Sequence, residues 1–425
     1  MKQGLSAYQN LITRNLASIF SFINLSFIQG ANILIQVLMI PIITRSIGLA
    51  SFGEVMVASS YAALVSLLVN FGSSQSGVKD VAIHKDDPKA LSVTFYTIFG
   101  VRSLLFLISL LSVAIMYLLR FHYADLFLMA NTIILSEVVN PLFFFIGLQN
   151  LFVYNLTNLL AKTSSAILIL IFIKSADQSL WINFYLGITN AIGYLLLCLY
   201  AVRKYKLSFC KISVSSFRKY MVENSYLTGN NILVQLQQSF FLFAVSGMGN
   251  PLLLGAYSLC DKIVWSFRIL IISFANAVYP KAVSLFQAGG THWHTFKKKM
   301  NYLLVAVFAC TSVVLFFYAH WIVFIITGAP NELAASFVKA VSLVPLAAAL
   351  NALNVIDMLM RGDYRTIFWI GLVIISIAVV VTEIFIFSGN THAFGFYPII
   401  IESSALPLYL YFIKKNNTTQ GQLNQ

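Results

Sequence analysis

The sequence predicts an all-α polytopic membrane protein with about 12 transmembrane helices in two pseudo-symmetric six-helix bundles. Of its 425 residues, 59% are hydrophobic and 10% are charged, and the mean hydropathy is +0.84. A soluble domain carries about a quarter charged residues, so the composition indicates an integral membrane protein. Apolar runs of about 20 residues, each long enough to cross a hydrocarbon core of ~30 Å, recur along the whole chain.

A repeated segment indicates that the two halves are similar. Gly30–Val37 reads Gly-Ala-Asn-Ile-Leu-Ile-Gln-Val, and Gly229–Leu236, 199 residues later, reads Gly-Asn-Asn-Ile-Leu-Val-Gln-Leu. Two similar halves of six spans each are the usual plan of a secondary transporter. Short glycine-containing pairs that follow each copy also correspond: Ile47-Gly48 and Phe52-Gly53 in the first half, Met248-Gly249 and Leu254-Gly255 in the second.

The expected spans follow the apolar runs in order. In the first half they are residues 15–43, 52–77, 93–119, 123–147, 151–173 and 179–202. In the second half they are residues 223–247, 252–280, 300–327, 333–360, 366–387 and 393–413. The predicted domains are therefore an N-terminal six-helix bundle (1–202), a basic cytoplasmic linker (203–222) and a C-terminal six-helix bundle (223–425).

The positions of the basic residues predict the orientation. The net charge of +13 arises from 27 Lys and Arg against 14 Asp and Glu. An even number of spans puts both termini on one side, and nineteen basic residues then fall on that side, against only Arg45, Arg120 and Lys174 on the other. By the positive-inside rule both termini are cytoplasmic, so the basic surplus is a topology signal rather than a nucleic-acid surface.

Cysteine and histidine spacings do not indicate a metal site or a disulfide framework. His292 and His294 are expected in a cytoplasmic loop beside Lys297, where a solvated loop is the favoured interpretation over a metal site. The four cysteines are scattered along the chain: Cys198, Cys210, Cys260 and Cys310.

Several expected spans carry polar residues at helical spacing. Asn32 and Gln36 share a face of the first span, and Asn231 and Gln235 repeat the pattern in the seventh. Such faces cannot lie against lipid, because unpaired polar groups in hydrocarbon cost several kcal/mol each. They must face other helices or a water-filled cavity, as must the faces formed by Asn155, Asn158 and Lys162 and by Asn351, Asn354, Asp357 and Arg361.

Charges inside the spans are the strongest functional signal, because each is costly to bury. Asp261, Glu137 and Asp357 are candidates for coupling a proton or a sodium ion. The structural alternatives are an interfacial pair of Asp261 with Lys262 and an i,i+4 ion pair of Asp357 with Arg361. Four basic residues without an acidic partner in the same helix suggest a cationic lining for a phosphate or diphosphate, with buried cross-helix ion pairs as the alternative: Arg102, Lys162, Arg268 and Lys339.

Signatures of enzymes and ATP-driven pumps are missing from the sequence. It has no Gly-rich Lys-Ser/Thr phosphate loop, no His-Glu-x-x-His and no Gly-x-Ser-x-Gly. Even the longest loop, the linker, leaves no room for a soluble catalytic domain. We therefore predict a transporter without a cofactor, which draws its energy from an H⁺ or Na⁺ gradient or from the cargo gradient.

Three segments resemble a known family. The first is Gly30–Pro41 with the Thr44–Gly48 exit, the second is Asn140–Gln149, and the third is Ala277–Lys281 with its aromatic-Pro-basic ending. The second segment is similar to a Pro-x-Trp-Phe-x-Gln-Gly-x-Glu motif but departs from it at Phe143, Ile146 and Gln149. Together they resemble the Wzx-type oligosaccharide flippases of the MATE/MOP (multidrug, oligosaccharidyl-lipid, polysaccharide) exporter superfamily.

The resemblance implies two bundles related by a pseudo-twofold axis along the membrane normal, around a cationic cavity that opens alternately to each side. The implied cargo is an undecaprenyl-diphosphate-linked sugar repeat unit, moved across the bacterial inner membrane for O-antigen or a related polysaccharide. The expected partners are this glycan, membrane lipid, a polysaccharide polymerase and a chain-length regulator, with no nucleic acid. We expect the anionic head group to be attracted by Arg268, Lys162, Arg102 and Lys339. We expect the interface between the two halves to be lined, or the sugar hydroxyls to be hydrogen-bonded, by Asn32, Gln36, Asn231 and Gln235.

Two alternatives stay open. A cation-coupled multidrug antiporter of the same superfamily would need an acidic cavity, and the basic residues inside the spans argue against one. A membrane enzyme of the same pathway, either a polymerase or an acyltransferase, would need a large external loop or catalytic His or Asp groups at the interface.

Overall fold

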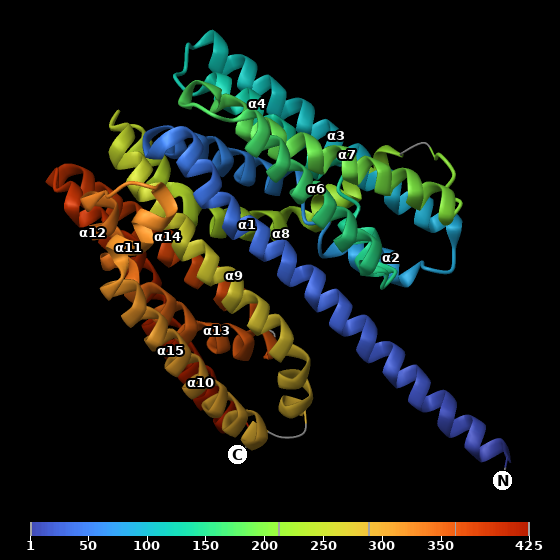
Figure 1. Ribbon diagram of the computed structural model, residues 1–425. Helices are drawn as coiled ribbons and strands as arrows, with labels where there is room; N and C mark the ends of the chain where they lie inside the picture. Colours follow the sequence, from blue (N-terminus) through green and yellow to red (C-terminus); the bar gives the residue numbers. More distant parts are fainter. Residues whose placement is uncertain (1, 211–212, 288–289, 362, 424–425) are drawn as a thin grey trace. The chain divides into compact units, whose positions relative to one another are not determined.

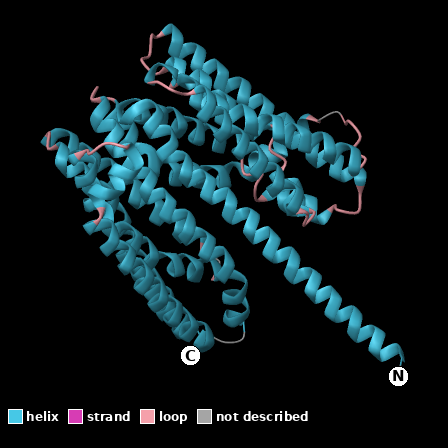
Figure 2. Ribbon diagram, in the orientation of Figure 1, coloured by secondary structure: helices cyan, strands magenta, loops and turns pink. Residues whose placement is uncertain are grey.

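The computed structural model describes residues 2–210, 213–287, 290–361 and 363–423, and all regular elements in these ranges are helices (Figure 2). The elements of the first half, of which Figure 1 labels all but α5 and η1, are α1 (Lys2–Asn70), α2 (Ser76–Ile83), α3 (Pro88–Leu118), α4 (Ala124–Val138), α5 (Leu142–Gly147), α6 (Leu151–Phe172), η1 (Ala176–Gln178) and α7 (Leu180–Lys204).

The second half is likewise helical, with two short 3₁₀ turns. Its elements are α8 (Val214–Ser246), α9 (Pro251–Gln287), α10 (Gly290–Phe317), α11 (Ala319–Thr327), α12 (Glu332–Ala340), η2 (Val341–Leu343), α13 (Val344–Met360), α14 (Tyr364–Ser388), η3 (Thr391–Phe396) and α15 (Tyr397–Leu423).

Nine helical segments in the described ranges are long and apolar enough to cross a membrane. One of them, Gly30–Asn70, contains a break at Gly48 and covers most of the second expected span together with part of the first. The all-α polytopic fold is thus confirmed, and the number of 12 spans is approximate.

Glycine and proline set the helix breaks. α1 passes through Pro41 and breaks only at Gly48, whose φ of 78° lies in the left-handed region that favours glycine. The equivalent Gly249, with a φ of 68°, lies between α8 and α9. The Asn140-Pro141 step separates α4 from α5, because proline lacks the N–H that would continue the helix.

The chain packs as two compact units. Unit 1 comprises residues 1–39, 65–173 and 180–228, and unit 2 comprises residues 40–64, 174–179 and 229–425. Residues 40–64 therefore pack with second-half helices, and residues 203–228 with first-half helices. α8 begins at Val214, inside the expected linker. The domains at 1–202 and 223–425, which follow the sequence repeat, stay a prediction.

The core of unit 1 is rich in phenylalanine. Phe95 from α3 packs against Phe144 from α5 at a ring distance of 5.3 Å, and Val81 of α2 and Leu197 of α7 are buried in the same cluster. The Tyr220 hydroxyl of α8 donates a hydrogen bond to a backbone carbonyl of the loop after α1. This cluster holds α2, α3, α5 and α7 together.

Unit 2 has its own core among α9, α10 and α13. Buried Ile271, Trp293 and Leu353 represent the three helices in it. A second aromatic group joins α8 to α15, where the rings of Phe241 and Tyr397 stack 4.2 Å apart. These contacts fix the helices that carry the charged residues of unit 2.

Candidate functional site

Arg102 of α3 is a fully buried cation of unit 1. Its Nη1 donates to the backbone carbonyls of Glu137, at 2.9 Å, and Asn140, at 2.6 Å, and its Nη2 donates to the Ser73 hydroxyl. Both carbonyls lie at the end of α4, where Pro141 interrupts the helix and cannot donate to the Glu137 carbonyl, which receives a 3.3 Å bond from the Asn140 N–H within the chain turn. The guanidinium therefore caps the broken helix.

Glu137 neutralises this cation across helices. Its carboxylate lies 3.5 Å from Nη2 of Arg102 and also accepts hydrogen bonds from the amides of Asn70 and Asn140. The arrangement is the buried cross-helix ion pair given as the alternative from sequence. Arg102 can reach a substrate only if these bonds break.

Lys162 has a different environment. It lies about 17 Å along the 22-residue helix α6, near the middle of this candidate membrane span, and is half-buried. No carboxylate lies within 4.0 Å of its ammonium among the described residues. Asn155 and Asn158 share its helix face, and Asn158 accepts a hydrogen bond from the Tyr194 hydroxyl at 3.4 Å. A charge without a counterion at the centre of a membrane helix costs about 2.5–3.5 kcal/mol, and an anionic ligand would offset this cost.

Two asparagines bring α1 and α6 of unit 1 together. The Asn32 amide donates to the backbone carbonyl of Asn155 at 3.4 Å. Its own Oδ1 and the Nδ2 of Asn155 are buried without a hydrogen-bond partner in the described ranges. One unused acceptor and one unused donor on adjacent side chains suit a hydroxyl group, which both donates and accepts. Gln36, one turn beyond Asn32, is half-buried.

Arg268 of α9 is neutralised in unit 2. Its Nη2 donates to Glu402 of α15 at 2.8 Å, and both side chains are less than one-fifth exposed. Asn351 of α13 donates to the backbone carbonyl of Glu402 at 3.0 Å and thereby joins a third helix to the pair. Glu402 is an intramembrane acid beyond those expected from sequence, and its position inside the expected span 393–413 is the signal that could have identified it.

Asp261 lies two turns before Arg268 on α9. It is half-buried, and no hydrogen bond or ion pair reaches its carboxylate from any described residue. The neighbouring Lys262 does not pair with it and instead lies over the Trp265 ring, 5.8 Å from its centre. The interfacial Asp261–Lys262 pair is therefore not formed in this part of the chain, and Asp261 is the least compensated of the three candidate ion-coupling acids.

Asp357 of α13 is fully compensated. One carboxylate oxygen accepts from the Trp293 indole at 3.0 Å and from Arg361 at 3.4 Å, and the other accepts from Lys297 at 3.1 Å. The i,i+4 pair with Arg361 is present as the structural alternative, and α10 adds a second cation. This group of four side chains joins α10 to α13 and leaves no carboxylate oxygen of Asp357 without a donor.

The remaining candidates are placed as follows. Lys339 of α12 is half-buried, without an ion pair to any described residue. Asn231 and Gln235 are half-buried on α8, and Gln235 donates to the Ser239 hydroxyl at 2.9 Å. Of the four basic candidates, Lys162 and Lys339 thus retain uncompensated charge in the described ranges.

The two histidines differ from expectation. His292 and His294 lie on helix α10 rather than in a loop, because the helix begins at Gly290, and both side chains are exposed. Within the described ranges, no three His, Cys, Asp or Glu side chains are placed to hold a metal ion.

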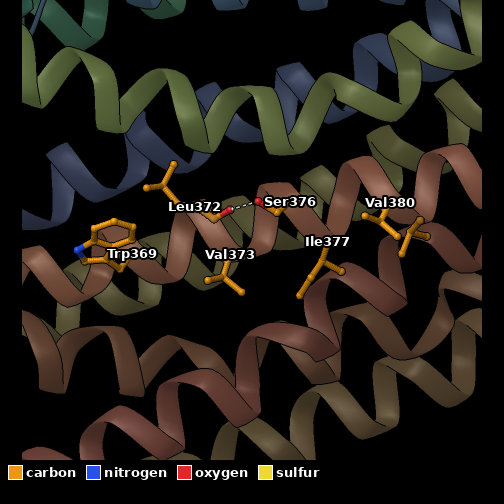
Figure 3. Close-up of a pocket in the computed structure, with 7 residues that line it drawn as sticks. Trp369, Leu372, Val373, Ser376, Ile377 and Val380 are labelled. Atoms are coloured by element: carbon orange, nitrogen blue, oxygen red, sulfur yellow. Dashed lines mark hydrogen bonds between the residues drawn. The ribbon is translucent and has the colours of Figure 1, made fainter.

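A hollow along α14 has an almost entirely apolar lining, in contrast to the polar faces described above. Figure 3 shows Trp369, Val373, Ile377 and Val380 along one side of the helix, with the Ser376 hydroxyl turned back to the carbonyl of Leu372 at 2.9 Å. This surface holds no charged side chain and its serine hydroxyl is satisfied within the helix, so it is a poor site for an anion.

The fold is that of known exporters. An inward-facing multidrug resistance MATE family transporter of the MOP superfamily matches with a TM-score of 0.73 at 12% identity, covering 92% of this chain and 96% of that chain. A eukaryotic MATE transporter, AtDTX14, matches with a TM-score of 0.57 at 16% identity, covering 93% and 96%. Identities this low establish the fold alone.

Similarity in sequence identifies the family, which the fold alone does not. Two proteins that share the name "Putative O-antigen transporter" match over most of their length. The protein of Shigella dysenteriae is 24% identical and covers 77% of this chain and 83% of its own, and that of Escherichia coli (strain K12) is 18% identical and covers 81% and 83%. The family model "Polysaccharide biosynthesis protein" matches residues 20–286, more than half of the chain.

These findings confirm the resemblance seen in the sequence and agree with a transporter rather than an enzyme. The chain belongs to the polysaccharide biosynthesis protein family.

Proposed function

We propose that this protein is a flippase that moves undecaprenyl-diphosphate-linked oligosaccharide repeat units across the inner membrane, for O-antigen or a related surface polysaccharide. The observation that carries the proposal is Lys162, a half-buried lysine without an acidic partner among the described residues, in the middle of a membrane helix of a polysaccharide biosynthesis protein. The names of the two relatives support the same cargo class.

The chemistry of the Lys162 face suits a glycolipid. The ammonium attracts a diphosphate as a point charge, and it is not engaged by a carboxylate in the described ranges. The amides of Asn155, Asn158, Asn32 and Gln36 can exchange hydrogen bonds with sugar hydroxyls. The lipid tail would stay in the bilayer, where it needs no polar partner.

Alternating access and ion coupling complete the proposal. Arg102 and Arg268 are held by Glu137 and Glu402, so either can bind an anionic head group only in a conformation that separates its pair. Asp261 is the preferred coupling acid for H⁺ or Na⁺, because its carboxylate is half-buried and forms no hydrogen bond or ion pair within 4.0 Å among the described residues. We expect a polymerase and a chain-length regulator of the same pathway as partners.

The test uses a strain that lacks this protein. Lys162→Gln is expected to reduce surface polysaccharide by roughly 10- to 100-fold at normal membrane abundance, because a charge-assisted contact contributes about 1.5–3 kcal/mol. Lys162→Arg keeps the charge and should restore most of the polysaccharide. The matched control is Lys89→Gln, an exposed lysine on α3.

The readouts are surface polysaccharide and the lipid-linked repeat unit that accumulates in the inner membrane. Full polysaccharide with Lys162→Gln would remove this residue from the site. A deletion strain with normal polysaccharide would overturn the cargo itself.

A cation-coupled multidrug antiporter is the second candidate, since one solved structure with this fold is a multidrug resistance transporter and Asp261 forms no ion pair within 4.0 Å among the described residues. Under this alternative, cells that express the protein should export a cationic dye, and Asp261→Asn should abolish export while the surface polysaccharide of the deletion strain stays normal.

A further inference from the structure

A groove runs along the outer side of unit 1 between α6 and α7. Its volume is about 560 Å³, within the size range of ligand sites. Gly193 of α7 opens the groove, because an added Cβ there would lie 3.2 Å from Thr157 and 3.4 Å from Ala161. The α6 side is contributed by Val153, Thr157, Leu160, Ala161 and Ser164, and most of the α7 side by Thr189, Ile192, Gly193 and Leu196.

The groove is separate from the proposed cargo face. At 100° per residue, the groove positions Leu160 and Ser164 lie on the opposite side of α6 from Lys162 and Asn158. The lining is mainly aliphatic, and its two threonine hydroxyls donate to carbonyls of their own helices at 2.9 Å. An apolar chain can therefore occupy it without displacing a polar contact.

One end of the groove is basic. A second hollow of about 490 Å³ shares Leu196 and Tyr200 with the groove and is also lined by Arg203 and Lys204. The distance along α7 from Thr189 to Arg203 is about 21 Å, somewhat more than half of the ~30 Å hydrocarbon core. Groove and basic end together thus span about one leaflet.

The basic end is arranged to face an anion. Nζ of Lys204 lies 5.2 Å and 5.5 Å from the ring centres of Tyr200 and Tyr205 and donates to the Tyr200 hydroxyl at 2.9 Å, which holds it beside the groove. Arg203 is exposed. Neither side chain forms an ion pair with a described carboxylate, so both charges are available.

We propose that this groove binds an anionic glycerophospholipid, with an acyl chain between α6 and α7 and the phosphate against Arg203 and Lys204. A neutral phospholipid would fill the groove equally well but would gain little from two cations. Basic residues that adjoin a membrane-embedded helix attract anionic head groups, each with a roughly fivefold effect on binding. The groove between α6 and α7 also fixes where the acyl chain lies, which the surface charge alone would not do.

The experiment measures lipid binding to the full chain, delipidated in a neutral detergent and titrated with phosphatidylglycerol or phosphatidylcholine, by native mass spectrometry. We expect phosphatidylglycerol to bind at least tenfold more tightly. The double variant R203Q/K204Q should lose roughly 25-fold in phosphatidylglycerol affinity and keep its phosphatidylcholine affinity. The matched control is Lys206→Gln, an exposed lysine of the same segment outside the groove.

A second variant tests the acyl groove independently of charge. Ser164→Phe fills the groove from α6 and should weaken both lipids, whereas Leu195→Phe, exposed on α7 but outside the lining, should weaken neither. Equal binding of the two lipids, or unchanged phosphatidylglycerol affinity in both R203Q/K204Q and Ser164→Phe, would overturn the proposal. Full-length undecaprenyl diphosphate that competes for the same groove would assign it to the cargo instead and would equally overturn it.

Discussion

Individual charges in this protein are stabilised in different ways. Arg102 has two backbone carbonyls, a hydroxyl and the Glu137 carboxylate as acceptors. Lys162 lies near the middle of a candidate membrane span with no carboxylate nearby in the described part of the chain. The first residue therefore belongs to the scaffold of unit 1 and the second to the proposed site, although both are single basic residues in an apolar span.

Arg102→Ala should destabilise the protein by about 3–5 kcal/mol, because it leaves Glu137 uncompensated and removes the donor that caps the end of α4. The measurement is the thermal unfolding of the purified protein in detergent. Arg365→Ala, an exposed arginine at the start of α14, is the control and should change little. An Arg102→Ala protein as stable as wild type would show that the guanidinium is not structural.

At the scale of elements, the glycines of the sequence repeat have distinct structural uses. Gly48 and Gly249 take left-handed backbone conformations at equivalent places in the two halves. Gly53 and Gly255, the next glycines of each copy, lie against each other inside unit 2: a Cβ on Gly53 would lie 2.6 Å from the backbone nitrogen of Gly255. The repeat therefore brings two equivalent helix starts into backbone contact.

Gly255→Ala should destabilise this packing by about 1–3 kcal/mol, because its Cβ would overlap the backbone carbonyl of Leu49. The matched control is Gly371→Ala on α14, where nothing lies within 4 Å and alanine should stabilise the helix by up to about 1 kcal/mol. Thermal unfolding of both variants tests the contact. Equal stabilities would mean that the two helix starts separate readily.

At the scale of the whole molecule, the distribution of basic residues determines the expected orientation. The linker and the segments between spans on the same side carry most of the Lys and Arg, whereas the opposite segments carry almost none. The nine described segments that can cross a membrane agree with a multi-pass protein.

Reporter fusions test the orientation directly. Alkaline phosphatase fused after Lys414 should be inactive and green fluorescent protein at the same place should fluoresce, because both termini are expected in the cytoplasm. Alkaline phosphatase inserted in the segment Ser388–Thr391 should be active. The opposite pattern at both places would reverse the topology.

How much the sequence could predict differs among these features. The 12 expected spans all fall on helical segments, because hydropathy and span length are local properties of the chain. The gap expected between the first two spans, residues 44–51, contains the break at Gly48, and α1 passes through Pro41 without one. The acids that compensate Arg102 and Arg268 could not be assigned, because they lie 35 and 134 residues away on other helices.

The sequence by itself determined that this is a helical membrane protein with repeated halves and charged residues inside its spans. Only the tertiary structure decided which of those charges are compensated, because an ion pair depends on which helix faces meet. It also decided that residues 40–64 pack with the second-half helices, through glycine contacts that no single-helix pattern specifies.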